Sequence, residues 1–423
     1  MRSEPGTGAV VSTSPRLGPS HMSTASLSST MYDEAAEQRH LQLRSEFLLD
    51  PDVVFLNHGS FGAAPRPVFE AYQRWQVELE RQPVEFLGRR MRDLMADARA
   101  KLAEYLGADS DEIVYFTNVT AALNAVARSL PLNDGDEILT TNHEYGALER
   151  TWTFVCEHRG ARLVVRELPL PFDDPADTVE ALWSGVTART KVLFMSHISS
   201  PTAMTLPIEP LIQRARERGI WTVIDGTHAV GQLPLDLHRL GVDFYGGNCH
   251  KWLSAPKGAG FLYARHDLQD LTEPVVISWG WRPHDPGPSV YVDQHERQGT
   301  RDPAAYLSVP DAIAYQAARN WPQVREECHA LAQFARASIL ELTGQEPLSS
   351  DDPRWYTQMA AVPLPPGTDT ERLKSLLYDE YRIEVPLTRW KQPGIRVSVQ
   401  GYNTRADMER LLEALTALLP RVQ

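Results

Sequence analysis

Between residues 112 and 265, short apolar runs alternate with longer segments in which apolar residues recur at helical spacing. Runs that are apolar throughout and lie between helices are typical of a parallel sheet covered on both faces. Ligands of such sheets bind beyond the carboxyl ends of the strands. We therefore predict an α/β unit with a mostly parallel sheet and a ligand site at one edge. The runs are 112–117, 137–142, 162–168, 191–197, 221–226, 242–251 and 260–265.

The C-terminal third has a different pattern, in which helical stretches surround the strand-like runs "TQMAAVPLP", "RIEVPL" and "IRVSVQ", and "TRADMERLLEALTALL" closes the chain as an amphipathic helix. The first residues are rich in Ser, Gly, Pro and Thr, a composition typical of a disordered leader. We predict a leader at 1–38, a segment at 39–70 that packs with the small domain, a large domain at 71–302 and a small α+β domain at 303–423.

Composition narrows the class of protein. The formal net charge of −13 argues against a nucleic-acid partner or an acidic membrane surface. The start of the chain lacks the apolar core of a secretory signal, and no apolar run reaches the roughly 18 residues that span a bilayer. Three widely spaced cysteines, Cys156, Cys249 and Cys328, match neither a metal site nor a disulfide framework. We expect a cytoplasmic enzyme without a metal.

The strongest chemical signal is Lys251 in "GGNCHKWLSAPKGAGFLYAR" (246–265). A lysine that follows a buried strand and precedes a Gly-rich turn is an unusual place for a charge. Desolvation there would lower the pKa of the amine and make it a usable nucleophile. Taken alone, Lys251 would be interpreted as a surface lysine. Two other motifs in the sequence reverse that interpretation.

The first partner is Asp225, which ends the apolar run of "VIDGTHA" (223–229). A buried aspartate needs a partner, and a protonated pyridine nitrogen supplies one. Such a carboxylate keeps the ring charged as an electron sink, the chemistry of pyridoxal 5′-phosphate (PLP). Without Lys251, the same residue reads as a helix N-cap or a Mg²⁺ ligand. Lys251 and Asp225 together therefore favour PLP.

The second partner is "TNVTAALN" (117–124), in which a strand ends at Thr117 and a helix begins near Thr120. Free N–H groups at a helix start, together with the helix dipole, bind phosphate well. N-cap threonines are common, so this motif is weak on its own. Beside Lys251 and Asp225 it predicts a phosphate site.

In their order along the chain, "TNVTAALN", "NHEYGA", "IDGTHAVG", "GGNCHKWL", "GTRDPAAY" and "IRVSVQ" resemble the class V aminotransferase family of fold-type I PLP enzymes. The N-terminal motif "FLNHGSFGAAP" (55–65) is similar to that of the isopenicillin N epimerase-like subgroup, and fungal-type cysteine sulfoxide lyases share it. The resemblance covers about residues 45–420. It implies a large PLP-binding domain with a mostly parallel, seven-stranded sheet and a small C-terminal domain.

The resemblance assigns roles residue by residue. Lys251 would carry PLP as a Schiff base, Asp225 would pair with its ring nitrogen, and His228 would donate to its phenolic oxygen. Tyr145 would stack on the ring. The residues implied on the phosphate side are Val119, Thr120, Asn248, His250 and, from a neighbouring subunit, Thr300. Arg396 would hold the substrate α-carboxylate, and Asn57 and His58 would lie near the substrate mouth.

Several of these residues have structural alternatives. Tyr145 reads as a half-buried aromatic at a helix start, His228 as a core histidine, Arg396 as a cross-strand partner and Asn57 with His58 as a turn cap. His143 reads as structural. His295 and Arg297 precede the Thr300 loop without a role of their own.

The same resemblance limits the reaction. A class V cysteine desulfurase needs a mobile cysteine shortly before the carboxylate arginine, and "PLTRWKQPGIR" contains none. Epimerisation is the first hypothesis, based on the N-terminal motif. A C–S lyase acting on a cysteine conjugate or sulfoxide, and an aminotransferase, are the alternatives. A non-catalytic regulator would usually have lost the lysine. The implied Thr300 contact makes a homodimer with shared active sites the expected assembly, acting on a small amino-acid substrate.

Overall fold

The computed structural model describes residues 32–423, so most of the predicted leader lies outside the described residues. Residues 32–38, which the sequence assigns to the leader as well, are part of the fold. Tyr32 and Ala36 are buried, and helix α1 (Glu34–Glu46) begins on Asp33, whose side chain accepts the Ala36 N–H. The leader boundary at residue 38 is therefore wrong, because contacts far along the chain hold α1, which has little amphipathic pattern.

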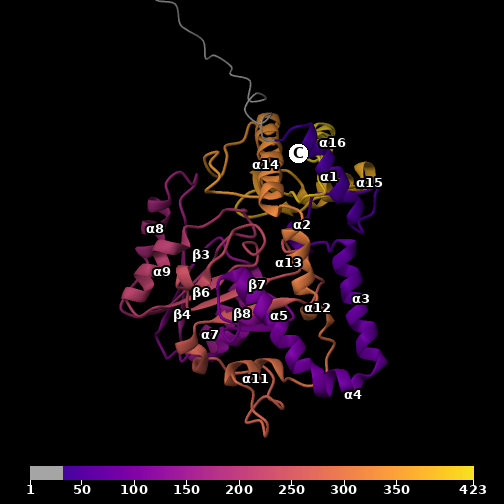
Figure 1. Ribbon diagram of the computed structural model, residues 1–423. Coiled ribbons are helices and arrows are strands. Elements are labelled where there is room, and N and C mark those ends of the chain that lie inside the picture. The colour runs from indigo at the N-terminus through magenta and orange to yellow at the C-terminus, as the bar shows by residue number, and fades with distance from the viewer. Residues whose placement is uncertain (1–31) are drawn as a thin grey trace, which may run out of the picture.

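A seven-stranded sheet lies at the centre of the molecule (Figure 1), in the order β2-β8-β7-β6-β5-β3-β4. The five strands from β7 to β4 run parallel to one another, and β8 is antiparallel to both of its neighbours. The predicted mostly parallel sheet is confirmed. The strands are β2 (Ile113–Phe116), β3 (Glu137–Thr141), β4 (Arg162–Arg166), β5 (Thr190–Ser196), β6 (Trp221–Asp225), β7 (Phe244–Asn248) and β8 (Gly260–Ala264).

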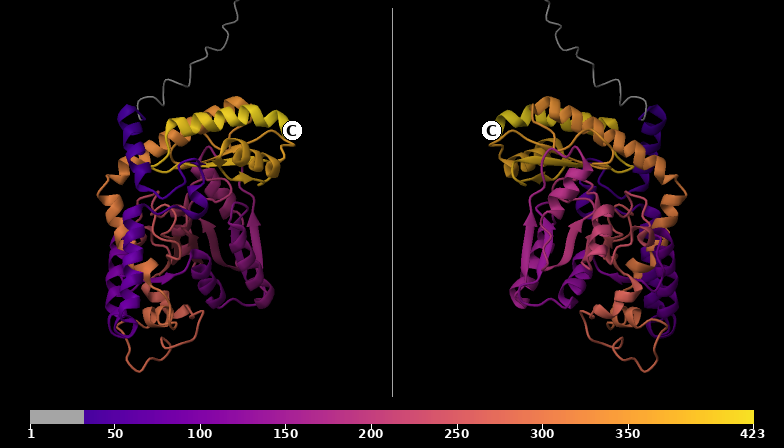
Figure 2. Two further views of the ribbon diagram at one scale, coloured as in Figure 1. Left: turned by 90° about the vertical axis from the view of Figure 1, so that its right-hand side faces the viewer. Right: turned by 90° about the vertical axis from the view of Figure 1, so that its left-hand side faces the viewer.

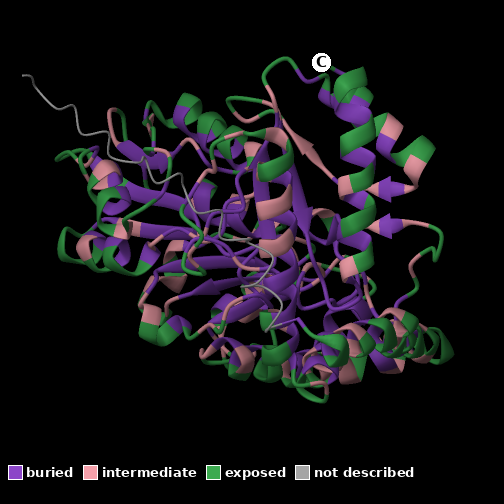
Figure 3. Ribbon diagram, turned by 90° about the horizontal axis from the view of Figure 1, so that it is seen from above, coloured by how far each residue is buried: buried purple, intermediate pink, exposed green. Residues whose placement is uncertain are grey.

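Both faces of this sheet are covered, which explains why its strands read as continuous apolar runs. Neighbouring residues of one strand, such as Val223 and Ile224, belong to separate apolar clusters on opposite faces. Seen from above, the buried strands lie inside a shell of helices with exposed outer sides (Figure 3). The helices of this unit are α5 (Met91–Leu106), α6 (Val119–Ser129), α7 (Gly146–Arg159), α8 (Pro175–Trp183), α9 (Ile208–Glu217), α10 (Leu237–Leu240), η3 (His266–Leu271) and α11 (Val290–Glu296).

A smaller unit caps one end of the large sheet (Figure 2). Its three strands, β9 (Met359–Pro363), β11 (Leu387–Thr388) and β12 (Gly394–Ser398), form an antiparallel sheet in the order β11-β12-β9. The helices of this unit are α14 (Trp321–Thr343), α15 (Thr370–Tyr381), α16 (Arg405–Leu418) and η4 (Leu419–Arg421). The small sheet therefore lies next to the edge at which ligands of α/β sheets bind.

The N-terminal segment joins the two units. Helix α1 contacts the small unit through an ion pair between Arg44 and Asp407, and the His40 ring donates to the Asn403 carbonyl over 2.6 Å. Strand β1 (Val54–Phe55) pairs in parallel with β10 (Ile383–Glu384). The chain then follows α2 (His58–Phe61), α3 (Arg66–Arg81), α4 (Pro83–Glu85) and η2 (Phe86–Arg90) into the large unit.

The first two helices after residue 303 pack with the large unit. Helices α12 (Ala304–Leu307) and α13 (Val309–Ala317) contact α3 and α5 of the large unit, and Gln316 donates to the Trp252 carbonyl over 2.8 Å. Helix α14 is the first to pack against β9 and α16. These contacts place the change of unit nearer Trp321 than the predicted residue 303, because helical spacing alone does not say which unit a helix covers.

Candidate active site

The candidate site lies where β6 and β7 end beneath the small unit. Asp225 is the last residue of β6 and Asn248 the last of β7. A Cβ atom at Gly226 would stand 1.9 Å from the Tyr245 ring, so only glycine fits the turn after β6. The tight turn brings Asp225, Thr227 and His228 to one sheet edge.

Lys251 has a depressed pKa at this edge. Burial first, and then the charge of Arg396, lower the pKa of its amine to about 7, although Asp225 opposes the shift. Its Nζ lies 3.5 Å from Nε2 of His228. A large fraction of the Lys251 amine is therefore neutral near pH 7, as a nucleophile requires.

Trp252 fixes the tautomer of His228. The indole N–H, which can only donate, bonds Nδ1 of His228 over 3.1 Å. Burial first, and then Lys251, hold the pKa of His228 well below its usual value, so the ring is neutral. Its single proton is therefore on Nε2, facing the Lys251 amine. The sequence interpretation missed Trp252, although a tryptophan directly after a buried lysine needs an acceptor for its N–H.

Asp225 is a buried carboxylate with few partners. It is 4% exposed, and Thr227 alone hydrogen-bonds it among residues 32–423, donating its N–H to Oδ1 over 2.9 Å. Burial raises its pKa, and the hydrogen bonds from Thr227 and the charge of Lys251 offset this in part. A cationic hydrogen-bond donor would complete the site, which is what a protonated pyridine nitrogen offers.

Asn248 ties the start of α6 to the sheet. Its Oδ1 accepts the Val119 N–H over 2.9 Å, and its Nδ2 donates to Thr227 Oγ1 over 3.3 Å. The helix begins at Val119 on Asn118, whose side chain accepts the Ala121 N–H. The predicted phosphate motif thus stands beside Asp225 and Lys251 as the start of an 11-residue helix.

His250 and Thr120 lie near the same helix start. Nδ1 of half-buried His250 donates to the Ala259 carbonyl over 3.2 Å, which leaves its Nε2 for another partner. Thr120 is in the first turn of α6 and is half-buried.

Arg396 is a buried cation without a paired anion. Its side chain is nearly fully buried, and burial lowers its pKa to about 10. Its Nη1 donates to the Ser200 carbonyl over 2.6 Å and its Nη2 to Ser60 Oγ over 3.4 Å, whereas its Nε has no partner. Within the described residues no carboxylate reaches ion-pair distance of it. Sequence reasoning missed Ser200 and Ser60, which carry no local signal.

The N-terminal motif packs directly under Lys251. Gly62 has a φ of +69°, and a Cβ atom there would stand 1.9 Å from the His250 carbonyl oxygen. The His58 ring donates to the Lys251 carbonyl over 2.9 Å through Nε2 and accepts the Tyr402 hydroxyl through Nδ1. Both of its nitrogens are occupied by protein atoms, so His58 supports the Lys251 main chain and does not face the substrate mouth as expected.

Asn57 is buried as well and donates to Glu384 over 3.0 Å. Tyr145 caps the start of α7 and is 45% exposed, a high value for a tyrosine at a ligand-binding sheet edge. Thr300 is exposed in the loop after α11, and no hydrogen bond or ion pair in residues 32–423 joins it to the other site residues. The structure therefore groups Lys251, Asp225, His228, Arg396, Asn248 and Val119, whereas no hydrogen bond or ion pair in the described residues joins Tyr145 or Thr300 to them.

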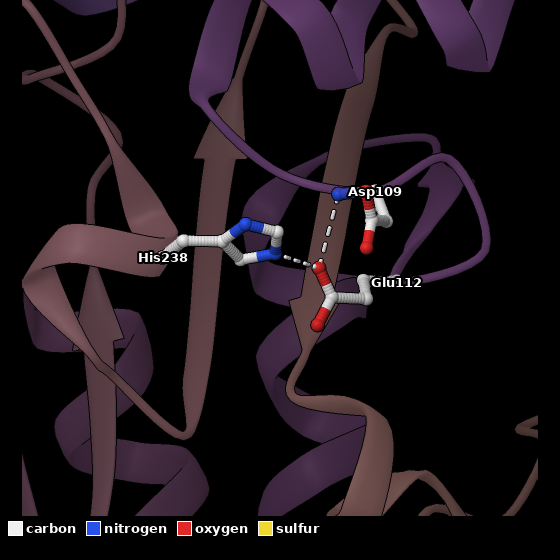
Figure 4. A group of neighbouring side chains, drawn as sticks. All are labelled: Asp109, Glu112 and His238. Atoms are coloured by element: carbon white, nitrogen blue, oxygen red, sulfur yellow. Dashed lines mark hydrogen bonds and ion pairs between the residues drawn. The ribbon is translucent and has the colours of Figure 1, made fainter.

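A second group of titratable side chains, Asp109, Glu112 and His238, lies next to the start of β2 (Figure 4). Glu112, directly before β2, accepts the Asp109 N–H over 3.0 Å and the His238 Nε2–H over 2.6 Å. The hydrogen bond to Glu112 raises the pKa of His238. Because protein donors satisfy the Glu112 carboxylate, we interpret the group as a structural contact and not as a metal site.

Comparisons with known proteins agree with this geometry. The family model described as aminotransferase class-V matches residues 63–411. Isopenicillin N epimerase of Amycolatopsis lactamdurans is 41% identical over 89% of this chain and 97% of that protein, and the one of Streptomyces clavuligerus is 38% identical over 89% and 98%. A probable chloroplastic L-cysteine desulfhydrase of Arabidopsis thaliana is 26% identical over 89% and 86%.

Among solved structures, a C-DES variant with glycine covalently linked to the PLP cofactor superposes with a TM-score of 0.76. The alignment covers 88% of this chain and 98% of that one at 21% identity. The likeness shows the fold, that of fold-type I PLP enzymes, as the sequence predicted. No helix of residues 32–423 has the length and apolar character needed to cross a bilayer.

Proposed function

This chain belongs to the class V aminotransferase family, and from that premise we propose that it is an amino-acid epimerase, which inverts the α-carbon of its substrate. It is an enzyme, and its cofactor is pyridoxal 5′-phosphate. Lys251, Asp225, His228 and Arg396 are the groups to which we assign the chemistry.

The residues at the sheet edge fit this cofactor. Lys251 would hold it covalently and Asp225 would pair with its ring nitrogen, which suits a buried carboxylate with only Thr227 as partner. His228 has its proton on Nε2, ready to donate to an oxygen. The start of α6 would hold the phosphate, with Thr120, Asn248 and His250 around it, and Tyr145 would cover the ring. When bound, PLP supplies a carbonyl that captures an amine and a ring that accepts electrons released at Cα.

Lys251 is the group that moves the proton. Its pKa of about 7 lets it alternate between neutral and charged forms near neutral pH, the condition for a general acid and base. The His58 ring holds the Lys251 carbonyl, so the backbone stays fixed while the side chain moves. An epimerase must return the proton to the opposite face of Cα, which requires that the substrate stays held meanwhile.

The burial of Arg396 without a paired anion is the single observation that supports an α-amino acid as the substrate. A buried guanidinium without an anion costs free energy, and a carboxylate is the partner that its planar fork fits. Ser200 and Ser60 fix its orientation. We assign it to the substrate α-carboxylate, which it would hold through both halves of an inversion.

The two epimerase relatives support inversion over the alternatives. The L-cysteine desulfhydrase relative keeps a C–S lyase as the second candidate. No cysteine lies in residues 386–395, and Cys249 is fully buried, so a persulfide-forming cysteine does not fit. An aminotransferase would use the same groups.

The fate of the Cα proton tests the proposal. Holoenzyme incubated with α-amino acids in D₂O should exchange the α-hydrogen for deuterium and yield the opposite enantiomer without ammonia or a keto acid. NMR and chiral chromatography report both. Pyruvate and ammonia from a cysteine conjugate, without inverted substrate, would replace the epimerase with the lyase. Dependence on a keto-acid acceptor would identify a transaminase.

The tautomer of His228 gives a second prediction. Trp252→Phe removes the indole N–H that keeps the ring proton on Nε2, and a hydrogen bond to a charged oxygen is worth about 1.5–3 kcal/mol. We expect the Kd of the cofactor to rise at least roughly tenfold. Trp321→Phe is the matched control, since that buried indole N–H has no partner in the described chain. Equal Kd values of the cofactor in Trp252→Phe and Trp321→Phe would show that Trp252 has no role in holding the cofactor.

We also propose that the enzyme is a cytoplasmic homodimer. The loop before α11 exposes Ile277, Trp279 and Trp281, and Val290 at the start of α11 is exposed as well. Large apolar side chains that are exposed this close together in the sequence favour an interface that a second copy covers. Thr300 follows the same helix, where a second copy would bring it to the phosphate side of the partner.

A further inference from the structure

A cavity of about 200 Å³ lies between the large and small units. Its lining includes residues of the large unit, Leu170, Pro201 and Thr202, and residues of the small unit, Ala361, Thr388 and Trp390. None of them belongs to the groups assigned above. An apolar cavity of about 150 Å³ binds benzene, so this space has room for a ring-sized group.

On the small-unit side, the cavity is lined by sheet neighbours of Arg396. In the β9–β12 pairing, Arg396 lies opposite Ala361 and Gly394 opposite Pro363, and Thr388 lies opposite Gly394. Directly paired residues of an antiparallel sheet point to the same face. One sheet face therefore runs from the Arg396 guanidinium to the cavity.

The large unit provides the facing wall. Arg396 bonds the Ser200 carbonyl, and the next two residues, Pro201 and Thr202, line the cavity. Trp390 closes the side: its N–H donates to the Asn142 carbonyl over 2.7 Å, and its ring lies 4.4 Å from that of His143. These contacts join the loops after β3 and β5 to the small unit, so the cavity lies next to the Arg396 guanidinium, the group assigned to the α-carboxylate.

The lining is mainly apolar. Its charged member is Lys391, which is exposed at the rim and paired with Glu167. Thr202 and Thr388 add hydroxyl groups. A small substrate side chain would leave this space empty, whereas a long, largely apolar one would displace water from it and gain the free energy of apolar burial.

We propose that this cavity is the side-chain subsite, and that the substrate is an α-amino acid with a long, largely apolar side chain. This inference rests on the proposed function, since it takes Arg396 as the carboxylate site. It makes Thr388, Trp390 and Ala361 specificity-determining residues. It also separates the enzyme from lyases of small sulfur amino acids.

Binding to the holoenzyme tests the subsite, followed by the change in the absorbance band of the bound cofactor. The probes are L-alanine and L-γ-glutamylanilide, which carries a phenyl ring at the end of a long side chain. Wild type should bind the anilide at least about tenfold more tightly, a difference of about 1.4 kcal/mol. Thr388→Tyr, which fills the cavity, should abolish that preference and leave the Kd of L-alanine unchanged.

Thr388→Val is the matched control, because it keeps the volume and should keep the preference. Trp390→Ala removes the side wall and should weaken the binding of the anilide but not that of L-alanine. This variant provides the test if Thr388→Tyr does not fold. Equal Kd values for both probes in wild type, or an unchanged preference in both Thr388→Tyr and Trp390→Ala, would overturn the subsite while leaving the proposed function intact. If neither amino acid changes the absorbance of wild type, the proposed function itself fails.

Discussion

Lys251→Ala is expected to abolish covalent attachment of the cofactor and to lower turnover by about 100- to 10,000-fold for the lost acid–base group alone. The reason is that the Lys251 amine lies at the ends of β6 and β7, 3.5 Å from Nε2 of His228. After borohydride reduction and proteolysis, mass spectrometry should find the reduced cofactor on Lys251 of wild type and on no lysine of the variant.

Lys257 is the matched control, because it lies in the same loop and burial also lowers its pKa. Lys257→Ala should keep the attachment and most of the turnover. Reduced cofactor on Lys257 of the wild-type protein would contradict the assignment of Lys251.

The pKa of Lys251 adds a pH dependence to this prediction. Only the neutral amine attacks a carbonyl, and its fraction rises with pH through about 7. Capture of added PLP by the apoenzyme should therefore accelerate as pH rises and level off above that value. Arg396→Met removes a charge that lowers this pKa, so its midpoint should move to higher pH. A midpoint near that of free lysine in wild type would show that the amine is not desolvated.

The sheet and its chemical edge could be predicted from sequence because both depend on local patterns. A strand that is apolar throughout predicts a sheet covered on both faces. A charged residue at the end of such a strand, such as Asp225, predicts a bound ligand. Lys251 follows from the same rule, since it comes three residues after β7. For these residues, one short segment of sequence contains both the strand pattern and the reactive side chain.

The remaining parts of the site could not be predicted because they depend on contacts between distant segments. His58 reaches the Lys251 carbonyl across 193 residues, and Arg396 reaches Ser200 across 196. No local pattern marks such pairs. The start of helix α1, residues 34–38, was assigned to the leader for the same reason. Polar contacts hold the helix in place, from Arg39 to Glu327 and from Arg44 to Asp407, more than 280 residues away.

Asp225→Asn should have effects of opposite sign on stability and on activity. The apoenzyme buries a carboxylate that Thr227 alone hydrogen-bonds, and its folded-state pKa is raised. The folded apoenzyme therefore binds this proton more tightly than the unfolded chain does. Its stability falls as pH rises from the ordinary aspartate value, 3.8, through the raised one. Asparagine keeps the acceptor for the Thr227 N–H without the charge, so the Tm of the apo variant should rise at neutral pH.

In the holoenzyme the same substitution removes the charge that would hold a proton on the ring nitrogen. Turnover should fall by about 100- to 1,000-fold, the range for loss of one preorganised electrostatic group. The fall should be in kcat more than in KM, because the electron sink matters most in the transition state. Calorimetry of the apoenzyme and steady-state kinetics of the holoenzyme give the two readouts. A purely structural Asp225 would lower Tm and activity together, whereas a functional one trades stability for catalysis.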